Sequence, residues 1–102
     1  MSQVKNAADE QQVKKAAERE KSEREIEMAD VKALMSSVIG RRFMNRLLSS
    51  CGLYRLSFNN SGSITAFNEG ERNVGLKFLA DVTEYPDLYL LMLQENRKVE
   101  RK

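Results

Sequence analysis

The first 25 residues contain neither Gly nor Pro and consist mostly of Ala, Glu, Lys, Gln and Arg, the residues that favour an α-helix most strongly. Six basic side chains balance six acidic ones here, and beyond alanine the only apolar residues are Met1, Val4 and Val13. A helix that is polar all round cannot bury a face in a core. The segment is therefore either a solvated helix or an arm that lies along a partner, and the residues leave both interpretations open.

Larger apolar residues follow between 26 and 39, at spacings of three and four that place them on one face of a helix. Beyond Gly40 the apolar stripe changes sides, beginning with Phe43. Arg42 and Arg46 then occupy the face that was apolar. A straight helix would have to bury two arginines or expose the apolar groups, so we predict that the long N-terminal helix bends near Gly40.

The two halves of this helix are predicted to have different neighbours. The half that contains Arg42 and Phe43 is expected to pack within the chain's own domain, and the earlier half to contact a partner. Each large apolar side chain that is fully buried there contributes about 1.5–3 kcal/mol. The predicted partner-binding residues are Val31, Leu34, Met35, Val38 and Ile39. The predicted organisation is a charged helical arm over 1–39, a compact helical domain over 40–98 and a basic tail over 99–102.

A small β-hairpin is predicted after this helix, which is expected to stop at Gly52, a residue suited to the left-handed position that follows a helix. Residues 53–58 are rich in β-formers, and the Asn-Asn-Ser-Gly cluster at 59–62 is typical of a turn. A second short extended run follows at 63–65. Together these runs favour two paired strands, which must lie on the helices to be stable.

Two further helices complete the predicted fold. One is expected to begin near Thr65 or Asn68, both suitable caps, and the other at Pro86, a favoured first position. The stripe predicted to be buried on the former helix comprises Val74, Phe78, Leu79 and Val82. The latter helix is apolar nearly all round over 88–93 and is expected to be central to the core. The predicted fold class is mainly α, with the bent N-terminal helix, the hairpin and two further packed helices.

The composition argues against catalysis. The chain has no His and a single Cys, Cys51, which removes the commonest general base, the commonest zinc ligand and any disulfide within the chain. Glu69 and Glu71 are two residues apart and face different sides of a helix, a poor arrangement for shared acid–base chemistry. We therefore expect no enzyme, no cofactor, no metal site and no small-molecule substrate.

Nothing in the sequence resembles a membrane anchor. The longest apolar run, 88–93, is far shorter than the roughly 20 residues needed to cross a bilayer, and the start of the chain lacks the apolar stretch of a secretory signal. We therefore expect a soluble product of an intracellular compartment.

Basic residues are concentrated in the middle of the chain, although the net charge is only +2. They are Arg41, Arg42, Arg46 and Arg55. One interpretation pairs Arg42 or Arg46 with the acidic residues Glu69 or Glu71, which needs no ligand. The other exposes the arginines as a stripe that contacts phosphates, with Tyr54 nearby for stacking. Ion pairing is the favoured interpretation, and phosphate binding remains the alternative.

Three blocks of sequence resemble a family of small virion-associated proteins of short-tailed bacteriophages over about residues 40–96. They are Gly40-Arg41-Arg42-Phe43-Met44-Asn45-Arg46-Leu47-Leu48, Cys51-Gly52-Leu53-Tyr54-Arg55 and Phe67-Asn68-Glu69-Gly70-Glu71-Arg72-Asn73-Val74-Gly75, and Tyr89-Leu90-Leu91-Met92 resembles the family's ending. The resemblance implies a phage setting without a transferable activity, and the arm lies outside it. Its polar residues here are Arg41, Arg42, Arg46, Asn68, Glu69, Arg72 and Asn73.

The expected function is that of a phage virion structural or assembly protein, made in the host bacterial cytoplasm and located in the virion. It would bind other virion proteins of the portal, tail or internal ejection core in multiple copies, as a homo-oligomer or bound to a ring. The alternative is a nucleic-acid-associated protein for genome packaging or delivery that uses Arg41, Arg42, Arg46 and Arg55. A third interpretation is an early factor that binds a host enzyme.

Overall fold

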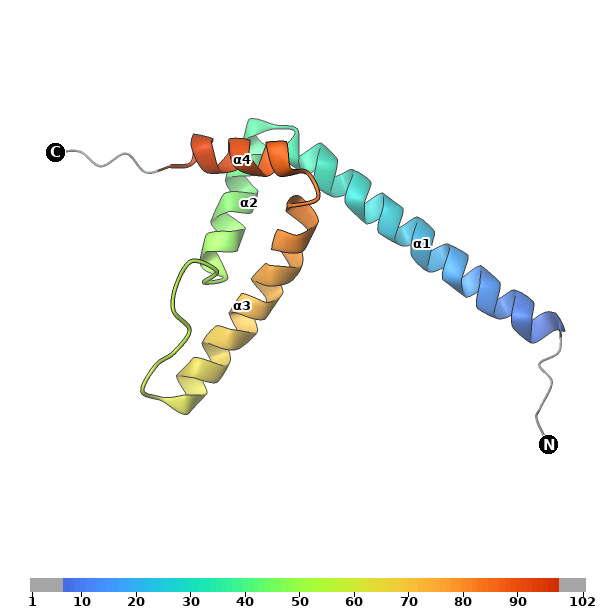
Figure 1. The fold of residues 1–102 in the computed structure, drawn as a ribbon, viewed down its shortest axis with the longest axis horizontal. Coiled ribbons are helices and arrows are strands. Elements are labelled where there is room, and N and C mark those ends of the chain that lie inside the picture. Colours follow the sequence, from blue (N-terminus) through green and yellow to red (C-terminus); the bar gives the residue numbers. More distant parts are fainter. Residues whose placement is uncertain (1–6, 98–102) are drawn as a thin grey trace. The chain divides into compact units, whose positions relative to one another are not determined.

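The structure, a computed structural model, describes residues 7–97. Within this range the chain forms four α-helices: α1 (Ala7–Met35), α2 (Val38–Ser50), α3 (Gly62–Val82) and α4 (Pro86–Glu95) (Figure 1). The described residues divide into two units, one up to Asp30 and one from Val31, so that α1 contributes to both. The predicted basic tail, 99–102, lies outside the described residues.

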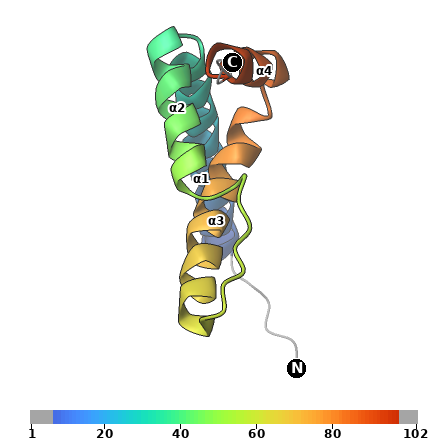
Figure 2. The same ribbon diagram turned by 90° about the vertical axis from the view of Figure 1, so that its left-hand side faces the viewer.

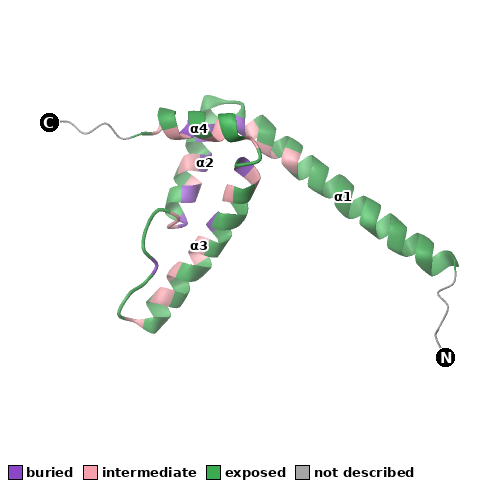
Figure 3. Ribbon diagram, in the orientation of Figure 1, coloured by how far each residue is buried: buried purple, intermediate pink, exposed green. Residues whose placement is uncertain are grey.

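The first unit, residues 7–30 of the described chain, is a single helical segment without a buried side chain. Every residue from 7 to 27 is exposed (Figure 3). Asp9 and Glu10 lie in the first turn, where carboxylates interact favourably with the positive end of the helix dipole. Arg24 forms an ion pair with Glu27 at 3.3 Å, one turn further along. Helix propensity and local charge pairs, rather than burial, therefore stabilise this segment.

The second unit begins with the last turn of α1, and the helix breaks sooner than predicted. α1 ends at Met35 and α2 begins at Val38, because Ser37 has an extended backbone and its Oγ accepts a hydrogen bond from the N–H of Gly40 at 2.9 Å. Gly40 is buried, and a Cβ atom there would overlap the carbonyl oxygen of Leu34. The prediction of one long helix bent near Gly40 is therefore wrong. A serine cap starts a new helix, and the glycine lets that helix pack closely on the end of α1.

The predicted β-hairpin is also wrong, because residues 52–61 form a loop and residues 7–97 contain no strand. α3 begins at Gly62, inside the cluster that favoured a hairpin turn. Ser61 caps this helix, and its Oγ accepts a hydrogen bond from the N–H of Ile64 at 3.4 Å. Asn and Ser residues favour turns and helix caps for the same reason, since their side chains bond to nearby backbone groups.

Side chains of α3 hold the loop in place of a second strand. Thr65 Oγ1 accepts a hydrogen bond from the N–H of Asn59 and donates one to its carbonyl oxygen, both at 2.9 Å. The Asn68 amide donates to the carbonyl oxygen of Ser57 at 3.0 Å. Side chains from the first two turns of α3 therefore satisfy three backbone groups of this loop.

Two predicted helix boundaries are confirmed. Gly52 follows the C-cap Cys51 with a φ of 74°, the left-handed conformation that ends a helix most easily with glycine. Pro86 is the first residue of α4, where its missing N–H costs no hydrogen bond.

The core of the second unit is small and receives side chains from all four helices. Its buried members are Met35, Met44, Leu48, Val82 and Met92. α2 packs against both α3 and α4, and α3 packs against α4 (Figure 2). Gly75 lies at the contact between α3 and the end of α2, where a Cβ atom would come within 2.6 Å of the Cβ of Cys51. Gly75 therefore permits close packing of these helices, whereas Gly70 faces open space.

The apolar stripe predicted for α3 is buried only at its end. Val82 is fully buried and Leu79 packs partly against the core. Val74 and Phe78 are 47% and 38% exposed. Val74 and Phe78 stay exposed because the neighbouring helices cover only the side of α3 that carries Gly75. No other part of the described chain covers the adjacent side.

Candidate interaction surface

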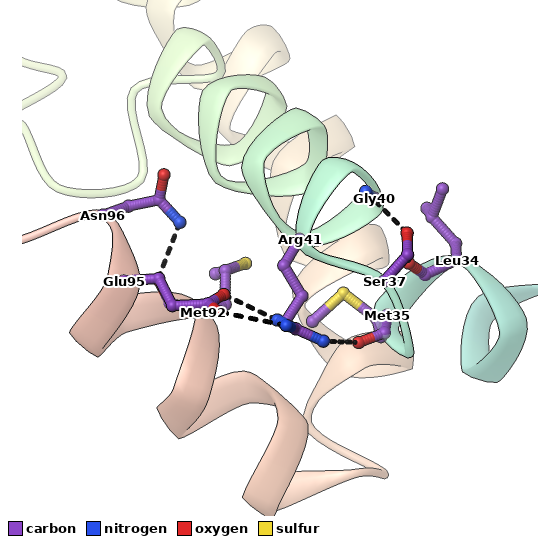
Figure 4. Close-up of polar contacts among 8 residues, drawn as sticks. All are labelled: Leu34, Met35, Ser37, Gly40, Arg41, Met92, Glu95 and Asn96. Atoms are coloured by element: carbon purple, nitrogen blue, oxygen red, sulfur yellow. Dashed lines mark hydrogen bonds and ion pairs between the residues drawn. The ribbon is translucent and has the colours of Figure 1, made fainter.

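A partly buried ion pair joins α2 to α4. The side chain of Arg41 is 7% exposed, and its Nε donates to Glu95 Oε1 at 2.6 Å while Nη2 donates to Oε2 at 2.9 Å (Figure 4). Nη1 donates to the carbonyl oxygen of Met35 at 2.9 Å. Because Met35 is the last residue of α1, one guanidinium connects three helices. Such a forked contact fits the planar geometry of arginine and carboxylate.

Both partners are stabilised in their charged forms. The hydrogen bonds from Arg41 hold the pKa of Glu95 below its usual value, and the same bonds raise the pKa of Arg41. Arg41 is therefore engaged within the fold, and its guanidinium is not presented to solvent for phosphate binding. The sequence did not indicate this pair, because its partners are 54 residues apart.

The other arginines of the predicted stripe lie on the surface. Arg42 and Arg46 are exposed on α2, and Arg55 is exposed in the loop. The guanidinium carbon of Arg46 lies 5.6 Å from the centre of the Phe43 ring, a cation–π distance. The structure thus leaves three of the four arginines accessible, and one of these three is placed over an aromatic ring.

The polar residues predicted on α3 do not meet the arginines of α2. Within residues 7–97 no ion pair joins Arg42 or Arg46 to Glu69 or Glu71. Glu69 and Asn73 are exposed, and Arg72 is half-buried.

A small polar hollow lies between the loop and α3. Arg55, Asn68 and Glu71 line it together with Cys51 and Ser57, and its volume is about 70 Å³. Pockets for small molecules usually measure roughly 300–1,000 Å³. This hollow is therefore too small to serve as a ligand pocket of that kind.

The predicted partner-binding residues divide between the core and the surface. Met35 is fully buried, and Val31 and Leu34 pack partly against the core. Val38 and Ile39 are 50% and 76% exposed. The chain's own helices thus cover much of the face that the sequence assigned to a partner, and the exposed remainder lies at the start of α2.

One of these exposed residues, Ile39, lines a groove on α2. Ile39, Arg42, Phe43 and Arg46 line a hollow of about 280 Å³, and their spacing places them on one face of the helix. Phe43 itself is 47% exposed, although the half of the helix that carries it packs within the domain through Met44 and Leu48. Two apolar side chains and two cations form this groove, and no acidic side chain lines it.

Exposed apolar residues occur on the other elements of the second unit as well. They are Tyr54, Leu56, Phe58, Ile64, Phe67, Val74, Leu76, Phe78, Leu90 and Leu91. Sequence reasoning missed Phe67 as an exposed surface residue, although its spacing from Val74 and Phe78 places all three along one side of α3. The hydroxyl of Tyr54 lies 3.3 Å from that of Tyr89, and partial desolvation of this hydroxyl together with the contact raises the pKa of Tyr54 to about 12, although the residue as a whole is exposed.

The part of the chain that the structure describes holds no group of three or more His, Cys, Asp or Glu side chains placed to bind a metal ion. Cys51 is a free thiol, buried at the end of α2. Among residues 7–97, no helix has the length and apolar character that a membrane span requires.

The structure therefore defines a small helical unit whose surface, rather than an enclosed site, carries the unusual features. Residues 31–94 match the family model of the Bbp19-like phage proteins, and the chain belongs to this family. The match confirms the resemblance to a phage family. It begins at Val31, where the second unit begins, so the helical segment before Val31 lies outside it. Comparisons with curated proteins and with solved structures give no match.

Proposed function

We propose that this phage protein is a structural or assembly component of the virion that binds other virion proteins, at the portal, tail or internal ejection core, in multiple copies. Its membership of a phage protein family supports the setting. The observation that carries the proposal is the balance of apolar side chains in the second unit. Thirteen large apolar residues between 31 and 97 are more than a third exposed, whereas five large apolar residues and Cys51 are buried.

This balance is unusual for a protein that works alone. Single exposed apolar residues are normal on a monomer. Large contiguous apolar patches are rare there, and they mark interaction sites. Leu56, Ile39 and Phe67 are 83%, 76% and 67% exposed, and they lie on the loop, on α2 and on α3. Burying a side chain of this size contributes about 1.5–3 kcal/mol, so several partners' surfaces or one enveloping partner would stabilise the unit substantially.

The nucleic-acid alternative has less support from the arginines. Arg41 is bound by Glu95 and Met35, and Arg46 lies over the Phe43 ring. Arg42 and Arg55 remain as exposed cations, and the charge of Arg42 also acts on Glu95. Two cations make a small phosphate-binding surface.

The test is the composition of purified particles. Phage that carry Phe67→Asp together with Val74→Asp should make a chain with the helix content of the wild type but incorporate it at a level lowered by about tenfold or more, because the substitutions place charges on an apolar contact. Asn73→Asp, at an exposed position of the same helix, is the matched control and should leave incorporation unchanged. Quantitative mass spectrometry of the particles measures both. Absence of the wild-type chain from particles, or normal incorporation of the double variant, would contradict the proposal.

A further inference from the structure

The side chains that line the groove on α2 indicate what kind of segment binds there. Ile39 and Phe43 form its apolar surface, and Arg42 and Arg46 add two positive charges, without an acidic side chain in the lining. Helices commonly bind in such grooves through an apolar anchor, with charged neighbours that complement the rim. The groove therefore fits a helix with one exposed apolar side chain and carboxylates one turn away on each side.

The first unit of this chain contains such a helix. Ile26 is 61% exposed on α1. Glu23 and Asp30 are three residues before it and four residues after it, so both lie on its face of the helix. Residues 23–30 carry four acidic side chains and one basic side chain, a net charge of −3. This segment is opposite in charge to the groove, and Ile26 is its one exposed large apolar side chain, with Met28 half-buried.

A second exposed apolar residue on the same helix lacks this charge pattern. Val13 is 58% exposed, nearly as much as Ile26. The equivalent stretch around it, residues 10–17, carries one acidic and two basic side chains, a net charge of +1. Charge complementarity therefore distinguishes Ile26 from Val13, and the chain supplies its own control.

We propose that the groove of Ile39, Arg42, Phe43 and Arg46 binds the Ile26 segment of α1 from a second copy of this chain. The inference rests on the proposed function, which requires several copies to act together. Because the contact joins two different surfaces, it can close into a dimer or a ring of copies. The Ile26 segment precedes Val31, so this contact is a property of this chain and not of the family segment.

The experiment uses two charge-reversed versions of the full chain. The first carries Glu23→Arg and Asp30→Arg, and the second carries Arg42→Glu and Arg46→Glu. All four positions are exposed, so circular dichroism should show the wild-type helix content in both. Alone, each version opposes like charges, and its association constant in sedimentation velocity should fall by about tenfold or more relative to the wild type.

An equimolar mixture of the two versions is the decisive sample. The Ile26 segment of each version then meets a groove of opposite charge on the other version, so association should return to near the wild-type level. It should also weaken as salt is added, because the charges are at the surface. If the Ile26 segment instead binds the groove of the same chain, the mixture should be no more associated than either version alone. This result would overturn the proposal.

Single substitutions test the apolar anchor. Ile26→Asp should lower the association constant by about tenfold or more, and Val13→Asp should leave it unchanged. Equal effects of the two substitutions, or a wild-type chain that sediments as a single copy at every concentration, would also overturn the proposal. A single-copy chain that still enters particles would reject this contact alone, whereas an associating chain that is absent from particles would reject only the proposed function.

Discussion

The two units show two ways of making a helix stable. Residues 7–30 form a helical segment that buries no side chain and depends on helix-favouring residues and local charge pairs. Residues 31–97 contain shorter helical segments, which depend on a shared core and on one partly buried ion pair. Helical stability in proteins comes mostly from packing, and helices without it need favourable sequence along their whole length. The comparison therefore predicts that damage to one unit leaves the other intact.

The largest effect is expected from Leu48→Ala. Leu48 is fully buried in the core of the second unit, and removing such a side chain costs about 2–5 kcal/mol. Since small domains are stable by only about 5–15 kcal/mol, the second unit should unfold at a much lower denaturant concentration. Leu90→Ala is the control, because Leu90 is 56% exposed on α4. Amide hydrogen exchange would show whether residues 7–30 keep their protection, and their simultaneous loss would break the comparison.

A pair of glycines in the second unit should give effects of opposite sign. Gly40→Ala places a methyl group on the backbone of Leu34 and should destabilise the unit by about 1–3 kcal/mol. Gly70→Ala adds its methyl group in open space within α3 and should stabilise by about 0.4–1 kcal/mol, because alanine favours the helix. Denaturant unfolding followed by circular dichroism measures both. If both substitutions destabilise the unit, the loss of stability at Gly40 cannot be assigned to its close contact with Leu34.

The Arg41–Glu95 pair should make the second unit sensitive to acid. The pKa of Glu95 is lower in the folded chain than the value of about 4.3 for a free glutamate, so its contribution to stability is present above that pH. The contribution is lost as the pH falls through the lowered pKa. Glu95→Gln should therefore be less stable than the wild type at neutral pH, and the difference should shrink on acidification. A difference that stays constant from neutral to acid pH would show that the charge of Glu95 does not stabilise the fold.

The smallest effect is expected in the first unit. Ala17→Gly lowers helix propensity by about 1 kcal/mol at an exposed position. It should reduce protection from hydrogen exchange around residue 17 and leave the unfolding midpoint of the second unit unchanged. Ala17→Gln, which keeps a good helix former, is the matched control. A shift of the midpoint with glycine alone would show that the two units are coupled in stability.

The sequence predicted the helices better than the contacts between them. Apolar spacing and end signals such as Gly52 and Pro86 are local, so they can be recognised along the chain. The loop was misassigned because Asn59 and Ser61 suit a hairpin turn and a helix cap equally well. In the structure Ser61 caps α3, and Thr65 bonds to Asn59.

The candidate surface was predicted in part for a similar reason. Periodicity identifies an apolar face but not what covers it, so Met35 and Ile39 received the same assignment although one is buried and the other exposed. The ion pair of Arg41 with Glu95 depends on how α2 and α4 meet, and no local pattern reports that distance.

Three of the five residues in the core are methionines: Met35, Met44 and Met92. Their side chains are unbranched and polarisable, so they fill irregular spaces without requiring one fixed shape of their neighbours. Replacement by leucine should therefore cost less than about 1.5 kcal/mol at each position. Conversion of these thioethers to sulfoxides would place a polar S–O group in the interior, which makes oxidants a chemical means of loosening the unit from within.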